Sequence, residues 1–355
     1  MDAIGIKIMI NFRLATEEDF PELVKLRNRL MKQPQDEAMW RWILNGPEHQ
    51  MLTTLIAENS IRIAGMFTSF PLSLYVNGQT IPGARANELM IDPDYRGQKL
   101  AAKLIEYLTK FVLEEKPMIY GFANQKSYKA VEKYGVWHSF DEIVPLAICP
   151  INIPRLLQIR LKIPGWLASI VGHMGQIGYQ LVTSKPNASM SITAIDTTDE
   201  RLDSLWEQAK QPFKIAAVRD RKYIHWRYLE SPNNYHVYGV EEDGKIIGII
   251  AFIIRDMFGY RAAFLMDLIT LPERDDAKET LLYHLRISAE EDSADLILAL
   301  NNVYHWQSLK RAGFIRIPGR FSPHETHLTY KIRESVPGID DASNWLITWG
   351  DHDFV

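Results

Sequence analysis

The chain has 355 residues, of which 46% are hydrophobic and 24% charged, and its formal net charge is −4. A chain of this length predicts two domains, or one large one, with enough core to need no disulfide or metal staple. The composition excludes disorder, a collagen-like repeat and a coiled coil as the main content, and the slight acidity counts against a nucleic-acid partner, which usually needs a strongly basic domain.

Other features favour a cytoplasmic protein without a membrane anchor. Residues 1–7 lack the basic and apolar segments of a secretory signal. The single cysteine, Cys149, excludes an intramolecular disulfide and a cysteine zinc cluster, and no metal site is predicted. Residues 163–184 carry no Asp, Glu, Lys or Arg, which is long enough to raise a membrane span. Their four glycines, one proline and polar side chains make a lipid-facing helix costly, so no stable membrane insertion is expected.

Strand and helix signals alternate along the first 150 residues. Thr16, followed by three acids, marks a helix start, and Asn77-Gly78 between apolar runs marks a hairpin turn. Apolar residues recur either with the helical period or in short runs typical of strands. In chain order these signals predict strands at 6–14, 52–58, 61–70, 86–91, 118–122 and 140–148, a hairpin arm at 72–81, and helices at 16–31, 36–44, 100–113 and 126–134.

The same order of elements returns after residue 186. Thr197 begins a capping box, Gly313 closes a helix as Gly135 does, and Asp267 takes the place of Glu88. The shift between matching landmarks stays at about 180 residues, which indicates two copies of one α/β unit. The second copy predicts strands at 191–195, 235–240, 245–254, 264–270 and 295–300, and helices at 197–206, 219–229, 277–289 and 303–312.

The stretch from Glu88 to Ala101 has the features of a phosphate site. A strand runs into a turn that leads to the N-terminus of an apolar helix, where backbone N–H groups point outward and the helix dipole favours an anion. Arg96 and Lys99 add positive charge, and Gly97 permits close approach of the backbone. These residues predict a site for a pyrophosphate.

This stretch resembles the acyl-CoA-binding motif of the GCN5-related N-acetyltransferase (GNAT) superfamily, which reads Arg/Gln-x-x-Gly-x-Gly/Ala. Arg96 and Ala101 fit its first and last positions, and Lys99 stands where glycine is usual. Asn124, with Gly135 eleven residues later, resembles the family's helix that closes on the pantetheine arm of the cofactor. The resemblance covers the chain from about residue 8 to about residue 149, and a weaker copy runs from about 190 to about 333.

The resemblance implies an α/β fold (an α+β mixed sheet, splayed, with helices on both faces) in two tandem GNAT-like acyl-CoA acyltransferase domains. It implies acetyl-CoA or another acyl-CoA as cofactor, lying between the strand that ends at Ile91 and the strand that ends at Phe122. Strand backbone groups would pair with the pantetheine amides, and the loop amides would hold the pyrophosphate. The residues implied to bind the cofactor are Met90, Ile91, Arg96, Gly97, Gln98, Lys99, Leu100, Ala101, Asn124 and Ser127.

The corresponding loop of the second copy departs from this motif. Residues 271–277 read LPERDDA, with no glycine and three acids, so they should repel a pyrophosphate. The second copy is therefore expected to have lost CoA binding, and it either builds the acceptor pocket or only supports the first copy.

These comparisons between the copies predict four segments. They are an acyl-CoA-binding N-terminal GNAT domain at 1–150, an apolar basic linker at 151–188, a degenerate C-terminal GNAT-like domain at 189–335 and a tail at 336–355. The linker packs between the domains or contacts an anionic membrane surface. The tail, with two tryptophans among apolar residues, could add a strand to one sheet.

Two side chains are candidates for acyl-transfer chemistry. Glu88 is the candidate general base, since the resemblance places an acid at this strand end; the alternative is a structural pair with Arg85 or another nearby side chain. The family's usual general acid, a tyrosine seven residues after the Asn, is replaced by Val131. Tyr128 or water could take its place, and the alternative for Tyr128 is core packing.

Matching residues of the second copy have structural interpretations beside functional ones. Asp267 is either an inherited acid with a structural hydrogen bond or a group that faces the acceptor amine. His305 lies on the matching helix, where a lone histidine is more often structural than catalytic. An arginine among aromatics could grip a sugar or an acidic substrate or pack in the core; this set is Tyr223, Trp226, Arg227 and Tyr228.

Together these features favour an acyl-CoA-dependent N-acyltransferase. The first hypothesis is transfer of an acetyl or longer acyl group from CoA to an amine of a small molecule, such as an amino sugar or an amino acid. The second is a catalytically impaired acyl-CoA-binding or scaffold protein, because Lys99 and Val131 depart from the family pattern. A third, aminoacyl transfer from tRNA, conflicts with the net charge of −4. The sequence predicts neither the acceptor nor the oligomeric state.

Overall fold

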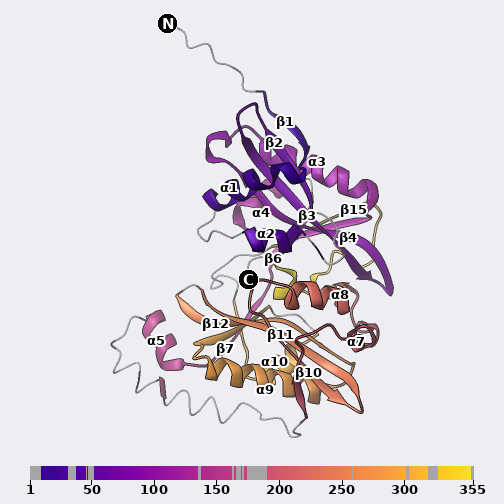
Figure 1. Cartoon of the computed structure of the whole chain (residues 1–355). Helices are drawn as coiled ribbons and strands as arrows, with labels where there is room; N and C mark the ends of the chain where they lie inside the picture. Colours follow the sequence, from indigo (N-terminus) through magenta and orange to yellow (C-terminus); the bar gives the residue numbers. More distant parts are fainter. Residues whose placement is uncertain are drawn as a thin grey trace. The chain divides into compact units, whose positions relative to one another are not determined.

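The chain forms two compact units in a computed structural model (Figure 1). Unit 1 contains Met1–Leu74, Ile81–Glu142 and Thr326–Pro337, and unit 2 contains Tyr75–Thr80, Ile143–Glu325 and Gly338–Val355. No helix among the described residues has the length and apolarity that crossing a membrane requires. The structure describes residues 9–30, 37–44, 46, 52–134, 137–161, 164, 169, 172–173, 190–257, 259–300, 304–318 and 327–352.

Unit 1 is built on a mixed sheet with the strand order β1-β2-β3-β4-β5-β15-β6. Neighbours β1, β2 and β3 pair antiparallel, whereas β4 and β5 are parallel, and β15 pairs antiparallel with β5. The strands are β1 (Asn11–Leu14), β2 (Thr53–Glu58), β3 (Ile63–Val76), β4 (Gln79–Ile91), β5 (Met118–Ala123), β6 (His138–Ile143) and β15 (His327–Ile332).

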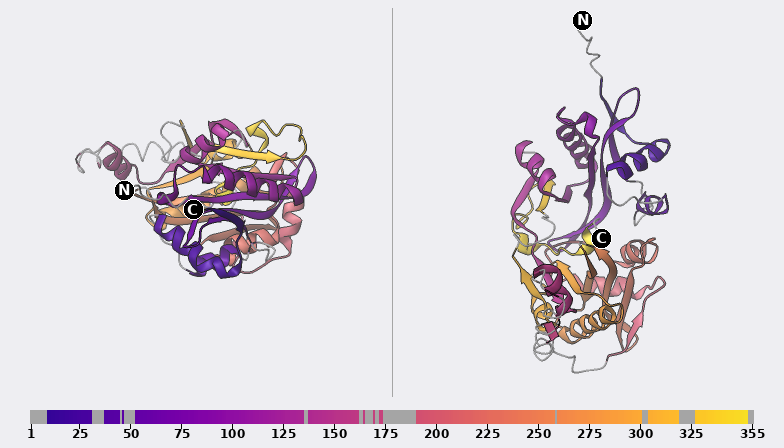
Figure 2. Two further views of the ribbon diagram at one scale, coloured as in Figure 1. Left: turned by 90° about the horizontal axis from the view of Figure 1, so that it is seen from above. Right: turned by 90° about the vertical axis from the view of Figure 1, so that its left-hand side faces the viewer.

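Helices cover both faces of this sheet, as the right-hand view of Figure 2 shows. On one face lie α1 (Phe20–Leu30) and α2 (Glu37–Leu44), and on the other lie α3 (Leu100–Glu115) and α4 (Gln125–Tyr134). The apolar side of α3 packs on β2, β3, β4 and β5 in one continuous core. The splayed sheet with two helical layers that the sequence implied is therefore confirmed for unit 1.

Unit 2 repeats this plan with the order β14-β7-β13-β12-β11-β10-β8. Its core joins the sheet to two helices that lie on one face, α9 (Asp275–Glu291) and α10 (Trp306–Arg311). The other helices described are α5 (Ile153–Leu161), α7 (Arg201–Ala209) and α8 (Arg221–Ile224), which continues as a π-helical turn, His225–Leu229. The strands of this sheet are β7 (Leu146–Pro150), β8 (Ile192–Ala194), β10 (His236–Glu242), β11 (Lys245–Met257), β12 (Tyr260–Thr270), β13 (Leu296–Leu300) and β14 (Ile315–Ile317); a further short strand of the unit, β9 (Ile215–Ala217), lies outside it.

Each sheet contains a strand from the opposite half of the sequence. The single strand expected at 140–148 is divided into β6 and β7, because Pro145 has no N–H to continue the ladder. β6 stays in the first sheet, while β7 pairs with β13 in the second. In return, β15 enters the first sheet and pairs with β5 over six residues. The expected domain boundary at residue 150 therefore differs from the division of the fold, which gives 143–150 to unit 2 and 326–337 to unit 1.

Two further expectations differ in detail. The arm expected at 72–81 is continuous with its neighbours, so that β3 and β4 form one long hairpin around Asn77-Gly78. The tip of this hairpin groups with unit 2, where the Asn77 N–H donates to the carbonyl of Lys214 (2.8 Å). Most of the linker expected at 151–188 lies outside the described residues, apart from α5 and a few single positions.

Candidate active site

The loop between β4 and α3 ends in an open, positively charged turn. Residues 96–99 are all exposed. Gly97 has a φ of +82°, and within the described part of the chain nothing lies within 4 Å of the place where its Cβ would stand. The Lys103 N–H donates to the carbonyl of Lys99 (3.2 Å), so the amides of Leu100–Ala102 precede the helical ladder and point outward. Because the first turn of α3 holds no acid, this end fits an anion such as a pyrophosphate.

Lys99 occupies the position of the motif glycine, and its backbone explains why glycine is usual there. It directly precedes α3 with φ 60° and ψ 20°, the left-handed conformation. For a residue with a Cβ this conformation costs about 1–2 kcal/mol. The chain therefore accepts backbone strain at a place where it gains a positive charge.

Buried polar contacts hold the loop in place behind this turn. Asp92, which is 2% exposed, caps the short 3₁₀ turn Pro93–Tyr95 by accepting from the Asp94 N–H (3.0 Å). The Asp92 carboxylate also pairs with Arg29 and, at 3.5 Å, with Arg62. Arg62 in turn makes side-chain hydrogen bonds with Tyr95 and Asp94, and these bonds, chiefly the one with Tyr95, raise the pKa of Arg62 above its ordinary value. The loop is thus fixed by charges other than Arg96 and Lys99.

The strands β4 and β5 separate beside this loop. Among the described residues, their pairing ends at Ala86 and Gly121. Ala86 and Leu89 both pack against the core under α3, although alternate residues of a strand face opposite sides and these two are three apart. Glu88 lies between these two residues, and its side chain reaches the opposite face, where Arg27 of α1 lies.

On that opposite face, Glu88 is paired with Arg27 of α1. The Arg27 Nε donates to the Glu88 carboxylate at 2.5 Å, and the two side chains are 7% and 9% exposed. The Arg27 guanidinium also lies 5.6 Å from the centre of the Trp40 ring on α2. Arg85, the partner that the sequence suggested, instead lies over Phe70 at 4.9 Å. The structure therefore places the candidate base beside a buried cation from α1.

The start of α4 brings the other candidate residues together. The Asn124 side chain accepts from the Ser127 N–H (3.1 Å), and its carbonyl accepts from the Tyr128 N–H (2.8 Å). The Tyr128 ring stacks on the His327 ring of β15, with centroids 4.0 Å apart and planes 18° apart. Val131 is buried in the core under α3. Sequence reasoning missed His327, because its strand lies 199 residues further along the chain and no motif marks it.

Residues 11–138 match a family model described as an acetyltransferase (GNAT) domain. The match includes the charged turn before α3, the acid of β4 and the helix that follows β5. This stretch of the chain is a GNAT domain. The chain is accordingly an acyltransferase. No curated protein matches the sequence at a significant level.

Solved structures share the two-unit GNAT fold at low sequence identity. N-myristoyltransferase from Saccharomyces cerevisiae, solved with bound myristoyl-CoA, is 14% identical with a TM-score of 0.60, over 92% of this chain and 84% of that one. A probable N-acyltransferase from Enterococcus faecalis is 11% identical with a TM-score of 0.63, over 91% and 72%. A GCN5-related N-acetyltransferase from Anabaena variabilis is 15% identical with a TM-score of 0.60, over 91% and 73%. These likenesses show the fold.

The second GNAT-like unit has no comparable anion site at the start of α9. Asp275 and Asp276 occupy its first turn, where acids complement the helix dipole. Asp275 pairs with Lys278 (3.1 Å), and Asp276 pairs with Arg274 (2.9 Å). These hydrogen bonds lower the pKa of each carboxyl group. This helix end therefore already carries its own anions, which oppose a further anion there.

Asp267, the counterpart of Glu88, is fully buried in a hydrogen-bonded cluster. Its carboxylate accepts from Arg219 Nε (3.1 Å to each oxygen), from the Tyr228 hydroxyl and from the Thr348 hydroxyl (2.7 Å). Arg219 also pairs with Asp351 at 2.7 Å. These carboxylates hold the pKa of Arg219 well above its ordinary value despite its burial. Every contact belongs to the protein itself, so Asp267 has the structural role that the sequence offered as one alternative.

The aromatic helix of unit 2 binds the C-terminal tail instead of facing a free pocket. The Tyr223 hydroxyl donates to the carbonyl of Gly350 (2.9 Å). Arg227 donates to the same carbonyl (3.3 Å) and to that of His352 (3.1 Å). In its described part, residues 338–352, the tail makes one parallel bridge, Ile215 with Trp345, and not the full strand that the sequence allowed. The interpretation of Arg227 as a substrate clamp is therefore replaced by core packing.

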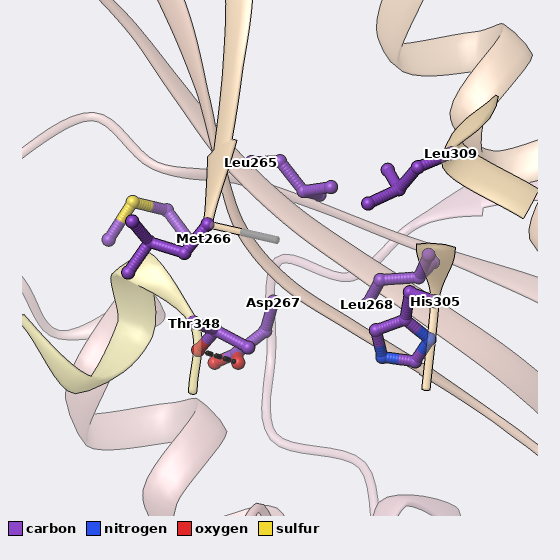
Figure 3. A pocket seen from close by; sticks show the side chains of 8 residues that line it. Leu265, Met266, Asp267, Leu268, His305, Leu309 and Thr348 are labelled. Carbon is purple, nitrogen blue, oxygen red and sulfur yellow. Dashed lines mark hydrogen bonds between the residues drawn. The ribbon is translucent and has the colours of Figure 1, made fainter. Parts of the chain in front are cut away.

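A small cavity remains where the second sheet separates (Figure 3). The pairing of β12 with β13 ends at Phe264 and Leu298, which corresponds to the separation of β4 and β5. The cavity beyond it measures about 10 Å³, roughly the room that one water needs. In Figure 3 Thr348 of the tail bonds Asp267 at its wall, and His305 lies on the other side. Burial lowers the pKa of His305 to about 3, so its ring is neutral. This space cannot hold a pantetheine arm.

Proposed function

We propose that the chain transfers an acyl group from acyl-CoA to an amine and that unit 1 holds the CoA. The contrast between α3 and α9 carries this proposal. The first helix follows the exposed side chains of Arg96 and Lys99 and has no acid in its first turn, whereas the second begins with Asp275 and Asp276. A pyrophosphate is stabilised at the first helix and repelled at the second.

The binding roles follow from the order of the elements. The amides of residues 97–101 and the side chains of Arg96 and Lys99 would hold the pyrophosphate. Backbone groups of Met90 and Ile91, at the separated end of β4, would pair with the pantetheine amides, and Asn124 and Ser127 would close on its other side. These residues are Met90, Ile91, Arg96, Gly97, Gln98, Lys99, Leu100, Ala101, Asn124 and Ser127.

Acyl-CoA supplies an activated thioester whose carbonyl carbon is attacked by the acceptor amine. Glu88 would accept the amine proton, directly or through one water, from the face opposite α3. Tyr128 would donate its hydroxyl proton to the departing sulfur from the start of α4. Unit 2 would only support this site. Among its described residues, Asp267 accepts a hydrogen bond from Thr348 of the tail, and the space where its sheet separates measures only about 10 Å³.

The donor we propose is acetyl-CoA, after the description of the matched domain. The neighbour solved with myristoyl-CoA makes a longer acyl chain the competing donor. The acceptor we propose is the amine of a small molecule, such as an amino sugar or an amino acid. A cytoplasmic location agrees with the single cysteine, Cys149, which cannot form an intramolecular disulfide.

One observation favours a second function, acyl-CoA binding without turnover. Val131 stands at the position of the family's usual tyrosine and is buried in the core. If Tyr128 does not replace that tyrosine, the chain binds acyl-CoA and transfers nothing. The two functions differ in turnover with amines and agree in CoA affinity.

Isothermal titration with acetyl-CoA tests the CoA site. The wild-type chain should bind one equivalent, and Arg96→Glu should abolish saturable binding. Arg274→Glu, the charge reversal in the corresponding loop of unit 2, is the matched control and should bind as the wild type does. Loss of binding in the control alone, or two sites per chain, would contradict the assignment to unit 1. Binding of palmitoyl- or myristoyl-CoA but not acetyl-CoA would move the donor to a longer chain.

A further inference from the structure

His327 and Tyr128 form a ring pair that joins the two ends of the sequence. Their centroids are 4.0 Å apart, and their planes are nearly parallel, at 18°. Tyr128 is half-buried on the first turn of α4, and His327 is 7% exposed on β15. Both residues belong to unit 1, because the fold gives residues 326–337 to that unit.

The histidine stands directly beside the separated strands. β15 pairs with β5 so that His327 is opposite Ala123 and Thr329 is opposite Gly121. The Thr329 hydroxyl donates to the carbonyl of Gly121 (3.2 Å), which fixes this register. Residues paired across two strands share a face, and Ile119 on this face packs in the core under α3 and α4. His327 therefore projects toward α4 at the place where β4 and β5 separate.

Hydrogen bonding does not account for the presence of a histidine at position 327. Its Nδ1 is buried and has no hydrogen-bond partner among the residues that the structure describes. A buried polar atom without a partner costs free energy, and an apolar ring at this position would avoid that cost. The contact that the histidine does make is the stack on Tyr128.

We infer that His327 is a positioning residue for Tyr128, so that the C-terminal strand completes the active site of the first unit. The backbone of Tyr128 is fixed by its N–H bond to the carbonyl of Asn124 (2.8 Å). A tyrosine ring has two further torsions, and a parallel ring held by β15 restricts both. The inference rests on the proposed function.

The step that this pair serves can be written with all its atoms. The amine nitrogen forms a bond to the thioester carbonyl carbon, and the carbon–sulfur bond breaks with its electron pair on sulfur. The Tyr128 hydroxyl gives its proton to that sulfur, which leaves as the thiol. Water returns a proton to the tyrosine oxygen, and Glu88 releases the proton taken from the amine. His327 loses and gains no proton in this sequence.

Two acetyl donors separate positioning from general support of the fold. The leaving group of acetyl-CoA is an alkyl thiolate, which needs a proton from an acid as it departs. The leaving group of S-phenyl thioacetate is thiophenolate, which is stable enough to depart without one. With hydroxylamine as the amine, Tyr128→Phe should lower kcat with acetyl-CoA by about 100-fold or more, and His327→Leu should lower it by at least about 10-fold. Neither variant should change the rate with S-phenyl thioacetate by more than about twofold. His327→Phe keeps a ring for stacking and should restore the acetyl-CoA rate.

Tyrosine ring signals in NMR give a readout that does not depend on turnover. The ring protons of Tyr128, assigned with Tyr128→Phe, should move in His327→Leu and stay near their wild-type positions in His327→Phe. An equal loss of rate with both donors in His327→Leu would show structural support only and overturn the inference. An unchanged acetyl-CoA rate in His327→Leu would also overturn it. If the wild-type chain binds no acyl-CoA in titration, the proposed function fails separately from the ring pair.

Discussion

Lys99 and Glu273 have the same left-handed backbone conformation, with φ angles of 60° and 61°, in the loops that precede α3 and α9. The two loops thus share one backbone feature, and the residue that has it carries a positive charge in one loop and a negative charge in the other. In unit 1 the strained residue is a cation beside open amides. In unit 2 it is an acid, and Asp275 and Asp276 lie in the first turn of the helix that follows. Side-chain charge, and not this backbone conformation, decides which helix suits a phosphate.

Lys99→Gly should raise stability and weaken CoA binding at the same time. Glycine relieves the left-handed strain, which should add about 1 kcal/mol to the free energy of unfolding. Loss of the charge should raise the Kd for acetyl-CoA several-fold, and the effect should shrink at high salt. Urea unfolding and isothermal titration at two salt concentrations measure both. Lys99→Ala is the control, since it removes the same charge and keeps the strain; a gain of stability in this variant would contradict the explanation.

Glu88→Gln should lower kcat by about 100-fold or more while the Kd for acetyl-CoA stays unchanged. The reason is that Gln keeps the shape of the side chain and cannot accept the amine proton. Arg27→Gln tests the structural alternative, because it breaks the same ion pair (2.5 Å) and leaves the carboxylate in place. We expect this second variant to lose about 3–5 kcal/mol of stability and far less of kcat at a temperature where it is folded. Equal losses of kcat in both variants would make Glu88 a structural residue.

Much of this site could be predicted from the sequence, because its signals are local. The acid of β4 and the charged turn of residues 96–99 lie within one short stretch of sequence. The turn directly precedes a helix, and an anion site at a helix N-terminus requires that arrangement. The ring pair could not be predicted, since β15 joins β5 across about 200 residues and strand pairing leaves no motif. Two copies of one unit would lead one to expect that each half of the sequence supplies all strands of its own sheet. The exchange of strands between the halves is visible only in the structure, where β15 pairs with β5 and β7 pairs with β13.

Asp19 should make part of the stability of unit 1 depend on acid pH. Hydrogen bonds from Arg13 lower its pKa from 3.8 to about 2. A carboxylate with a lowered pKa stabilises the fold above its unfolded pKa and loses that contribution as pH falls toward the folded value. Asp19→Asn should therefore cost about 1 kcal/mol at pH 7, a value reduced because Arg13 is 37% exposed. Urea unfolding at pH 7 and near pH 2 measures it, and a difference that persists at pH 2 would exclude this cause.

Gly350→Ala should destabilise unit 2 and leave CoA binding in unit 1 unchanged. A Cβ at Gly350 would lie 2.4 Å from a carboxylate oxygen of Asp267 and 2.6 Å from the Tyr228 hydroxyl. Neither group can move aside freely. The Asp267 carboxylate is held by hydrogen bonds from Arg219 and Thr348, and the Tyr228 hydroxyl is held by its own hydrogen bond to Asp267. Such overpacking costs about 1–3 kcal/mol.

Gly244→Ala is the matched control for this change. Its Cβ would meet nothing within 4 Å among the described residues, and only its φ of +74° opposes the substitution. It should therefore cost about 1 kcal/mol. Urea unfolding compares the two variants, and titration with acetyl-CoA under native conditions should give the wild-type Kd for both. A raised Kd in Gly350→Ala with a folded chain would contradict a role of the tail that is confined to unit 2.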